Sequence, residues 1–480
     1  MKRERDHFRF WIFNCRLEPL RFPRLAGVQG NRKSKAKNPQ SLFLPLFTFL
    51  LLALLSPALA HAEQRFPPPD FDTGHVLPTT VQTLPPSGWY EVADVTMLIL
   101  MLAAAMWLTL RQRSRNWIVG LSLLAVAYFG FWRRGCVCPI GAIQNVTFAL
   151  TNHTYILPLG VALFFLLPIL AAFWAGRAFC SGVCPFGALQ DLVLVRPITL
   201  PRWIDEGLGI IPYVYLGLAI LLAGFGARFI ICEYDPFIGI FRLAGSIPML
   251  LTGAGLLAIG LFIGRPYCRF LCPYGAILRF VSRFAARSVR IAPQTCVNCR
   301  LCESSCPYGA IHRPVRPPTT PQHQAARRRV LGTLAAAPAL ILVGLAIGAM
   351  LGPALSSLHP VVNLASIVQK YDHDKAAATS PITMPDEVTA FYKTGISPAE
   401  LNAQALGLRR RFTLAAALVG AFWGLVIAGR LLRLARRRGE QEYSADRTAC
   451  VACGRCFEDC PKELQRRGRI APVLVWEPRP

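Results

Sequence analysis

The sequence has few acidic residues and lacks the motifs of several common redox and nucleotide proteins. Aspartate and glutamate number 26 against 52 lysines and arginines. No G-x4-G-K-[S/T] occurs, so no nucleotide-driven pump is indicated, and the absence of C-x-x-C-H excludes haem attachment through that motif. A membrane haem would need paired histidines inside apolar segments, but these histidines lie in expected loops or at segment ends: His153, His312, His323, His359 and His373.

Long apolar segments are what the chain does have. Hydrophobic residues make up 53% of the 480 residues, and only 16% are charged. Segments near the length that crosses a bilayer fall at 94–110, 117–132, 155–174, 206–225, 246–264, 330–351 and 412–430. The net charge of +26 comes mostly from arginines flanking these segments. This pattern predicts about seven spans, positive-inside topology and contact with anionic lipid rather than nucleic acid.

The N-terminal part resembles an export signal. Residues 1–62 combine a basic stretch with an apolar stretch that ends in small-x-small sequences, typical of a signal peptide or an uncleaved anchor. The Pro-rich segment 63–93 would then lie outside, followed by a five-span domain over 94–290.

Alternation of the spans puts a two-span hairpin at 319–435, with an exterior loop over 352–411. That loop contains Tyr371, Asp372, His373 and Asp374 and either docks a partner or is a solvated linker. Its mixed polar composition favours the linker.

Two copies of C-x2-C-x2-C-x3-C-P flank the hairpin. The copies comprise Cys296, Cys299, Cys302, Cys306 and Cys450, Cys453, Cys456, Cys460. This is the ligand spacing of bacterial ferredoxins with two [4Fe–4S] clusters, in which the fourth cysteine of each run serves the other cluster. One cluster is therefore predicted at Cys296, Cys299, Cys302 and Cys460, and the other at Cys450, Cys453, Cys456 and Cys306.

The two copies imply a single α+β ferredoxin domain, with halves at 291–318 and 436–480, split by the hairpin. Zinc sites and disulfide frameworks also use C-x2-C pairs, but neither fits this spacing repeated twice. The small or apolar residues between the thiols are expected to shield the sulfurs: Val297, Leu301, Val451, Ala452 and Gly454. The topology places both halves and the C-terminus in the reducing cytoplasm, where thiolates persist.

A second cysteine pattern, R-x-x-C-x3-C-P-[F/Y]-G-A, occurs at Cys180 and Cys184 and again at Cys268 and Cys272. These four cysteines are candidates for an additional metal or redox-active thiol site. The alternative is that C-P-x-G-A starts a helix, with proline in the first turn and small residues for close packing. The spacing identifies no particular metal.

Three further cysteines, Cys136, Cys138 and Cys232, are predicted on the exterior face. A redox or metal site, a structural disulfide and simple packing all stay open for them, because C-x-C alone has low specificity. Cys15 lies in the leader and receives no role.

Taken together, these motifs resemble the NosR/NapH/CcoG-type membrane polyferredoxins over residues 94–465. The resemblance implies electron exchange at the bacterial cytoplasmic membrane between the quinone pool, or another membrane donor, and a partner oxidoreductase. Nitrous oxide reductase and nitrate reductase systems are served by such proteins. The exterior segment 61–93 is too short for the flavin-binding domain of NosR-like members, so FMN is not expected.

The expected protein is therefore mainly α, a polytopic membrane protein with a split ferredoxin domain. It would carry two [4Fe–4S] clusters and a hypothetical third metal centre, without FMN, haem or nucleotide. Its first predicted role is an electron carrier without substrate chemistry of its own. The alternative role is an assembly or maturation factor that handles metal for a copper or iron respiratory enzyme.

Overall fold

The computed structural model describes residues 88–135, 137–198, 200–291, 296–314, 320–377, 384–436 and 443–469. The expected signal peptide or anchor, Cys15, Cys136 and most of the Pro-rich segment lie outside these residues. The chain divides into two units, 1–82 and 83–480, and every described residue belongs to the second.

The part before the first ferredoxin motif is entirely helical within the described residues. Its elements are α3 (Gly88–Trp107), η2 (Leu108–Gln112), α4 (Arg115–Ala125), η3 (Val126–Trp132), α5 (Pro139–Thr151), α6 (Leu159–Ala175), α7 (Ala178–Gly182), α8 (Pro185–Leu192), α9 (Arg202–Leu208), α10 (Ile211–Gly224), α11 (Ile230–Tyr234), α12 (Pro236–Arg242), α13 (Ile247–Gly260), α14 (Pro266–Phe270), α15 (Pro273–Val281) and η4 (Ser282–Phe284).

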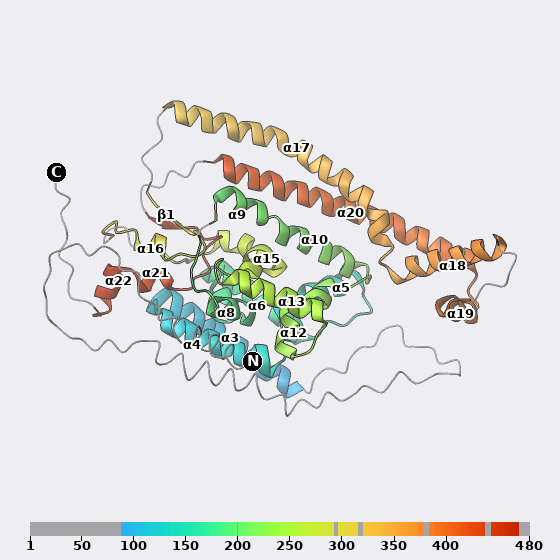
Figure 1. The fold of residues 1–480 in the computed structure, drawn as a ribbon, viewed down its shortest axis with the longest axis horizontal. Coiled ribbons are helices and arrows are strands. Elements are labelled where there is room, and N and C mark those ends of the chain that lie inside the picture. The colour runs from blue at the N-terminus through green and yellow to red at the C-terminus, as the bar shows by residue number, and fades with distance from the viewer. Residues whose placement is uncertain are drawn as a thin grey trace, which may run out of the picture. The chain divides into compact units, whose positions relative to one another are not determined.

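The remaining elements belong to the ferredoxin halves and the hairpin between them (Figure 1). They are α16 (Leu301–Ser304), β1 (Ile311–His312), α17 (Thr320–Ser356), α18 (Pro360–Ala377), α19 (Asp386–Lys393), α20 (Pro398–Ala435), β2 (Ser444–Ala445), α21 (Arg455–Glu458) and α22 (Pro461–Arg466).

Four described helical segments are long and apolar enough to cross a membrane: Gly88–Gln112, Arg202–Gly224, Gln324–Ser356 and Pro398–Ala435. A fifth is possible if α12 and α13, bent by 103° at their junction, form one broken span. The expected span at 155–174 corresponds to α6, which is shorter, and the one at 117–132 is divided between α4 and η3. The predicted number of seven is therefore not confirmed. The first span also begins earlier than expected, at Gly88 rather than residue 94.

The predicted hairpin is formed by α17 and α20, which lie side by side (Figure 1). Glycines allow the two backbones to approach closely. A Cβ added at Gly348 would collide with the carbonyl oxygen of Ala416, and one at Gly420 with the carbonyl oxygen of Gly344. Small residues at a helix contact are the usual means of close packing in membranes.

The region between the hairpin helices is not the solvated linker that its composition favoured. Helix α17 continues to Ser356, and α18 and α19 follow before α20 begins at Pro398. Apolar side chains from α18, α19 and the start of α20 form a separate small core: Val362, Ala365, Val368, Tyr371, Val388, Phe391, Leu401 and Ala405. The mixed polar composition of this region did not reveal its core, because each helix of an amphipathic cluster needs only one apolar face and can be polar elsewhere.

The two ferredoxin halves pair with each other. Strand β1 lies antiparallel to β2, with Ile311 opposite Ala445 and His312 opposite Ser444. Residues separated by the whole hairpin thus form one two-stranded sheet.

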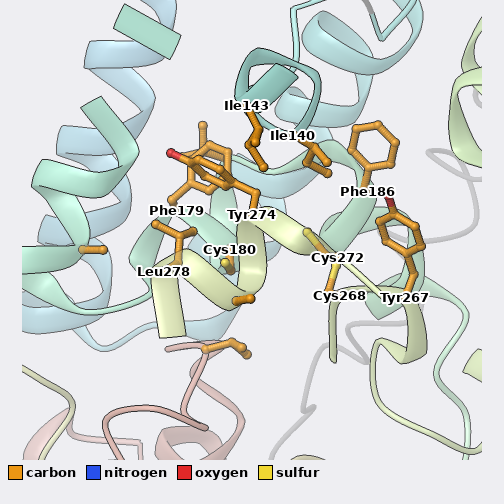
Figure 2. Close-up of a cluster of buried hydrophobic side chains, with 14 of the residues drawn as sticks. Ile140, Ile143, Phe179, Cys180, Phe186, Tyr267, Cys268, Cys272, Tyr274 and Leu278 are labelled. Atoms are coloured by element: carbon orange, nitrogen blue, oxygen red, sulfur yellow. The ribbon is translucent and has the colours of Figure 1, made fainter. Parts of the chain in front are cut away.

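The main core contains both C-x3-C-P repeats. Figure 2 shows Cys180 and Phe186 from the first repeat together with Cys268, Cys272 and Tyr274 from the second. Aromatic rings fix this arrangement, because Phe186 packs against Phe237, Phe241 and Tyr267. The cysteines therefore lie in the interior of the helical part and not on its surface.

Candidate functional site

Four ferredoxin cysteines surround a small cavity and are called the inner cysteines below: Cys306, Cys450, Cys453 and Cys456. Cys306 and Cys453 are buried, each 9% exposed. The same cavity is lined by apolar residues of both halves, including Ile311 and Val451.

The other four, called the outer cysteines, line a neighbouring cavity of about 460 Å³: Cys296, Cys299, Cys302 and Cys460. Cys456 lines both cavities, so the two sets are adjacent. Cys296 and Cys299 are exposed. Apart from Cys456, each cysteine lines only the cavity of the set to which the crossed pairing assigns it, and cluster ligation by these sets stays a prediction.

The two cysteine loops share one backbone conformation. In each copy, the residues two and four positions after the first cysteine have positive φ: Asn298 and Arg300 in the first, Ala452 and Gly454 in the second. Such turns direct backbone N–H groups toward one point and form anion-binding concavities that are common at iron–sulfur sites. Ala452 N donates to Cys450 Sγ at 3.4 Å, as this geometry requires.

The chemistry of each set fits a [4Fe–4S] cluster. Each set comprises four thiols, one for each iron of a cubane. No group of three His, Cys, Asp or Glu side chains suited to a single metal ion occurs among the residues that the structure describes. Burial raises the pKa of Cys302 to about 11 and that of Cys450 to about 12, so these sulfurs become thiolates only when a positive centre binds them.

A third group comprises Cys180, Cys184, Cys268 and Cys272, called the repeat cysteines below. Figure 2 shows Cys180, Cys268 and Cys272 close to one another inside the core. Cys184 donates a hydrogen bond to Cys268, and this bond lowers the pKa of Cys268 to about 7, helped by the Arg265 guanidinium and opposed by burial. The sequence marked these four cysteines as candidates for one additional site, but it did not show whether the two repeats face each other.

The C-P-x-G-A motif also starts helices, as the alternative interpretation proposed. Cys184 and Cys272 are the N-cap residues of α8 and α15, each followed by proline in the first turn. A Cβ at Gly187 would lie 3.1 Å from the Cys180 carbonyl oxygen, and one at Gly275 would lie 3.0 Å from that of Cys268. The glycine is thus needed to hold the two cysteines of each repeat together, so the motif serves packing and thiol placement at once.

Asp191 at the end of α8 connects the repeat cysteines to the ferredoxin domain, and sequence reasoning missed it. Its carboxylate lies 3.3 Å from Arg115, 3.5 Å from Arg265 and 3.4 Å from Arg455 of α21. Burial alone would raise the pKa of Asp191, but the three guanidinium groups outweigh it and hold the pKa at about 2. The only signal in the sequence was an acidic residue shortly after C-P-F-G-A-L in a chain with few acids.

Cys138 and Cys232 come from different helical segments and lie near each other. A Cβ at Gly141, in the helix that Cys138 caps, would be 3.2 Å from Cys232 Sγ. Gln144 of the same helix accepts a hydrogen bond from Cys232 N at 3.3 Å. Because Cys136 is not described, a site of three exterior thiols stays a prediction.

Comparisons with known proteins match the cysteine-bearing regions. A family model described as "4Fe-4S binding domain" matches residues 156–201 and 246–292, which contain the repeat cysteines. Another with the same description matches residues 288–311, which contain the first ferredoxin motif. No solved structure matches the chain.

Three curated relatives have related sequences. Protein NirI of Paracoccus denitrificans is 36% identical over 144 residues, covering 28% of this chain and 21% of NirI. The putative electron transport protein YccM of Escherichia coli is 29% identical over 182 residues, covering 34% of this chain and 51% of YccM. The regulatory protein NosR of Stutzerimonas stutzeri is 26% identical over 212 residues, covering 40% of this chain and 29% of NosR. The chain thus spans about half or less of the length of each of these relatives.

Proposed function

Because the chain belongs to the NosR/NirI-type membrane ferredoxin family, we propose that it is a membrane-bound iron–sulfur electron carrier. It relays electrons between the quinone pool, or another membrane donor, and a partner oxidoreductase of the nitrous oxide or nitrate reductase type. The observation that carries the proposal is the gathering of the eight ferredoxin cysteines around two adjacent cavities.

In this proposal the outer cysteines hold one [4Fe–4S] cluster and the inner cysteines hold the other. Such clusters supply one-electron transfer, with potentials set by hydrogen bonds to sulfur, charge and burial. The two sets differ in burial, and the proposed contribution of the chain is therefore to hold two centres of unequal potential next to each other.

The repeat cysteines are proposed to hold a third centre. Support comes from the family model over both repeats and from the charges around the site. Arg265 is close enough to interact electrostatically both with Cys268 of the repeat cysteines and with Cys453 of the inner cysteines. Cys272 interacts in turn with Cys138. Because two ferredoxin clusters on one side do not reach across about 30 Å of bilayer, a row of further sulfur sites would extend the path.

The proposed location is the bacterial cytoplasmic membrane, with the ferredoxin domain and the C-terminus in the cytoplasm and Cys138 and Cys232 on the exterior side. Arginine-rich segments around both ferredoxin halves support this orientation. An N-terminal leader and a total of seven spans belong to the same proposal.

A maturation factor for a copper or iron enzyme is the second candidate function. The observation that favours it is the buried group of repeat cysteines, in which one thiol has a pKa near neutrality and is ready to bind a soft metal. The two functions differ in what occupies this group: a permanent iron–sulfur centre serves a relay, whereas exchangeable copper serves delivery.

The deciding experiment measures iron, copper, zinc and acid-labile sulfide per chain on anaerobically purified protein, with EPR after dithionite reduction. The carrier requires at least about eight irons with matching sulfide, the content of two cubanes. About twelve irons would place a third cluster at the repeat cysteines, and bound copper would favour maturation. Protein without sulfide, or clusters that neither quinone analogues nor a partner can reoxidise, would refute the carrier function.

A further inference from the structure

A cavity of about 260 Å³ lies where α9, α15, the end of α20 and the second ferredoxin half meet, outside both sets of ferredoxin cysteines. Seven arginines line it, against three carboxylate residues. The arginines are Arg177, Arg202, Arg265, Arg269, Arg279, Arg430 and Arg433, and the acids are Asp205, Glu206 and Asp446.

The carboxylates of α9 are already engaged with particular arginines. Arg269 lies 2.7 Å from Asp205, and Arg430 lies 2.7 Å from Glu206 in a pair in which both side chains are buried. Arg265 pairs with Asp191 outside the cavity lining. The excess positive charge of the cavity is thus not cancelled by these acids.

Two of these arginines form no ion pair among the described residues. Arg177 is 3% exposed, and its closest polar contact is a 3.4 Å hydrogen bond to the Thr448 carbonyl oxygen. Arg279 donates to the Arg269 carbonyl oxygen at 3.1 Å. Within the described residues, the Nε atoms of both are buried without a hydrogen-bond partner, and neither residue forms an ion pair.

The two cations also repel each other. Burial, followed by repulsion from Arg177 and Arg430, lowers the pKa of Arg279 to about 10. Arg177 additionally faces Cys268, so a centre at the repeat cysteines would offset part of its charge. Arg279 is half-buried and faces Arg177 and Arg430, whose repulsion outweighs the attraction of Asp205, so its surroundings favour a counter-ion.

We propose that this cavity binds a phosphoryl anion between Arg177 and Arg279. Guanidinium groups bind phosphate oxygens in bidentate fashion, and the two arginines line the same cavity without a carboxylate partner among the described residues. The volume exceeds the need of a monatomic ion. The cavity also lies at the ends of the segments Arg202–Gly224 and Pro398–Ala435, at the level of lipid headgroups. The phosphoryl group comes from an anionic phospholipid headgroup or from free phosphate.

The test uses the full chain, loaded with its clusters and delipidated in detergent. Inorganic phosphate and dihexanoyl phosphatidylglycerol are titrated separately, with sodium chloride at matched ionic strength as the reference, and the dissociation constant is measured by calorimetry. The Arg279→Gln variant removes the charge. Arg283→Gln is the matched control, because Arg283 is exposed and lies one helical turn further along.

One saturable phosphoryl site per chain is expected, with binding weakened at least about tenfold by Arg279→Gln and less than about twofold by Arg283→Gln. Tighter binding of the lipid identifies a headgroup site, and tighter binding of phosphate identifies a free-ion site. No saturation by either probe, or equal weakening in both variants, would overturn the proposal.

A stability measurement separates binding from a structural role. Without phosphoryl ligand, Arg279→Gln should unfold at the same temperature as the wild type or a higher one, because a repulsive charge is gone. Added ligand should raise the midpoint of the wild type only. A variant that unfolds earlier without ligand and still responds to phosphate would show that Arg279 serves packing, and would refute the site.

Discussion

The inner and outer cysteines have the same motif but lie in different surroundings. Cys306 and Cys453 are buried, whereas Cys296 and Cys299 are exposed. The residues between the thiols differ in the same way: Val451 is 4% exposed, but Leu301 is 47% exposed. A common motif thus defines the ligands of a cluster but not its contact with solvent.

The difference comes from what each loop packs against. Gly454 in the second copy lies against α4, where an added Cβ would be 3.1 Å from Ile118 Cδ1. Arg115 of the same helix donates to the Cys453 carbonyl oxygen at 3.0 Å. The inner cysteines therefore face α4, and in the proposed carrier the exposed outer cysteines would be the ones that a soluble partner approaches.

The largest expected effect is the loss of one cluster when a single cysteine of the inner or the outer set is replaced. Cys453→Ser and Cys299→Ser should each remove one cluster and about half of the ferredoxin iron, because each deletes one of four ligands. The inner variant should also destabilise the ferredoxin domain more, since it empties a buried site. Iron analysis, EPR and thermal unfolding test this.

Cys232→Ala is the control for these variants, because Cys232 lies apart from both sets. Its iron content should equal that of the wild type. Iron loss in this variant, or loss of the same EPR signal in both ferredoxin variants, would contradict the division into two sets.

The second-largest effect concerns Asp191, which links the helical part of the chain to the second ferredoxin half. Asp191→Asn leaves Arg115, Arg265 and Arg455 without their shared carboxylate, and breaking a buried ion pair costs about 3–5 kcal/mol. The inner cluster should become labile while the outer signal persists. Asp374→Asn, at an exposed position on α18, is the matched control.

The stabilisation that the Asp191 carboxylate provides should depend on pH. The pKa of Asp191 is lowered from 3.8 to about 2 in the folded protein, so its stabilising contribution is complete well above 3.8 and is lost as the pH falls through about 2. Denaturant midpoints of the wild type and Asp191→Asn should therefore converge on acidification, measured on the cluster-free chain by circular dichroism because cluster sulfide is acid-labile. A constant difference would exclude this role for the carboxylate.

Much of the site could be predicted from the sequence because cysteine spacing is a local property. The grouping of the eight ferredoxin cysteines into two crossed sets follows from the repeated motif, and their ligation of clusters stays a prediction. The repeated C-x3-C-P motif marked four further cysteines, but whether the two repeats meet could not be read from their spacing. Asp191 and Arg279 could not be found in this way, because their partners are distant in the chain and follow no period. Apolar length alone also does not settle the span count, since α6 is short and the bend between α12 and α13 is invisible to hydropathy.

The smallest effect requires no mutation and tests exposure directly. An iron chelator added under mildly oxidising conditions should remove the ferredoxin iron in two phases of about equal size, because Cys296 and Cys299 are exposed and Cys306 and Cys453 are buried. The fast phase should vanish in Cys299→Ser and persist in Cys453→Ser. If it persists in Cys299→Ser instead, the inner cluster is the more accessible one and the partner must dock on the side of the membrane helices.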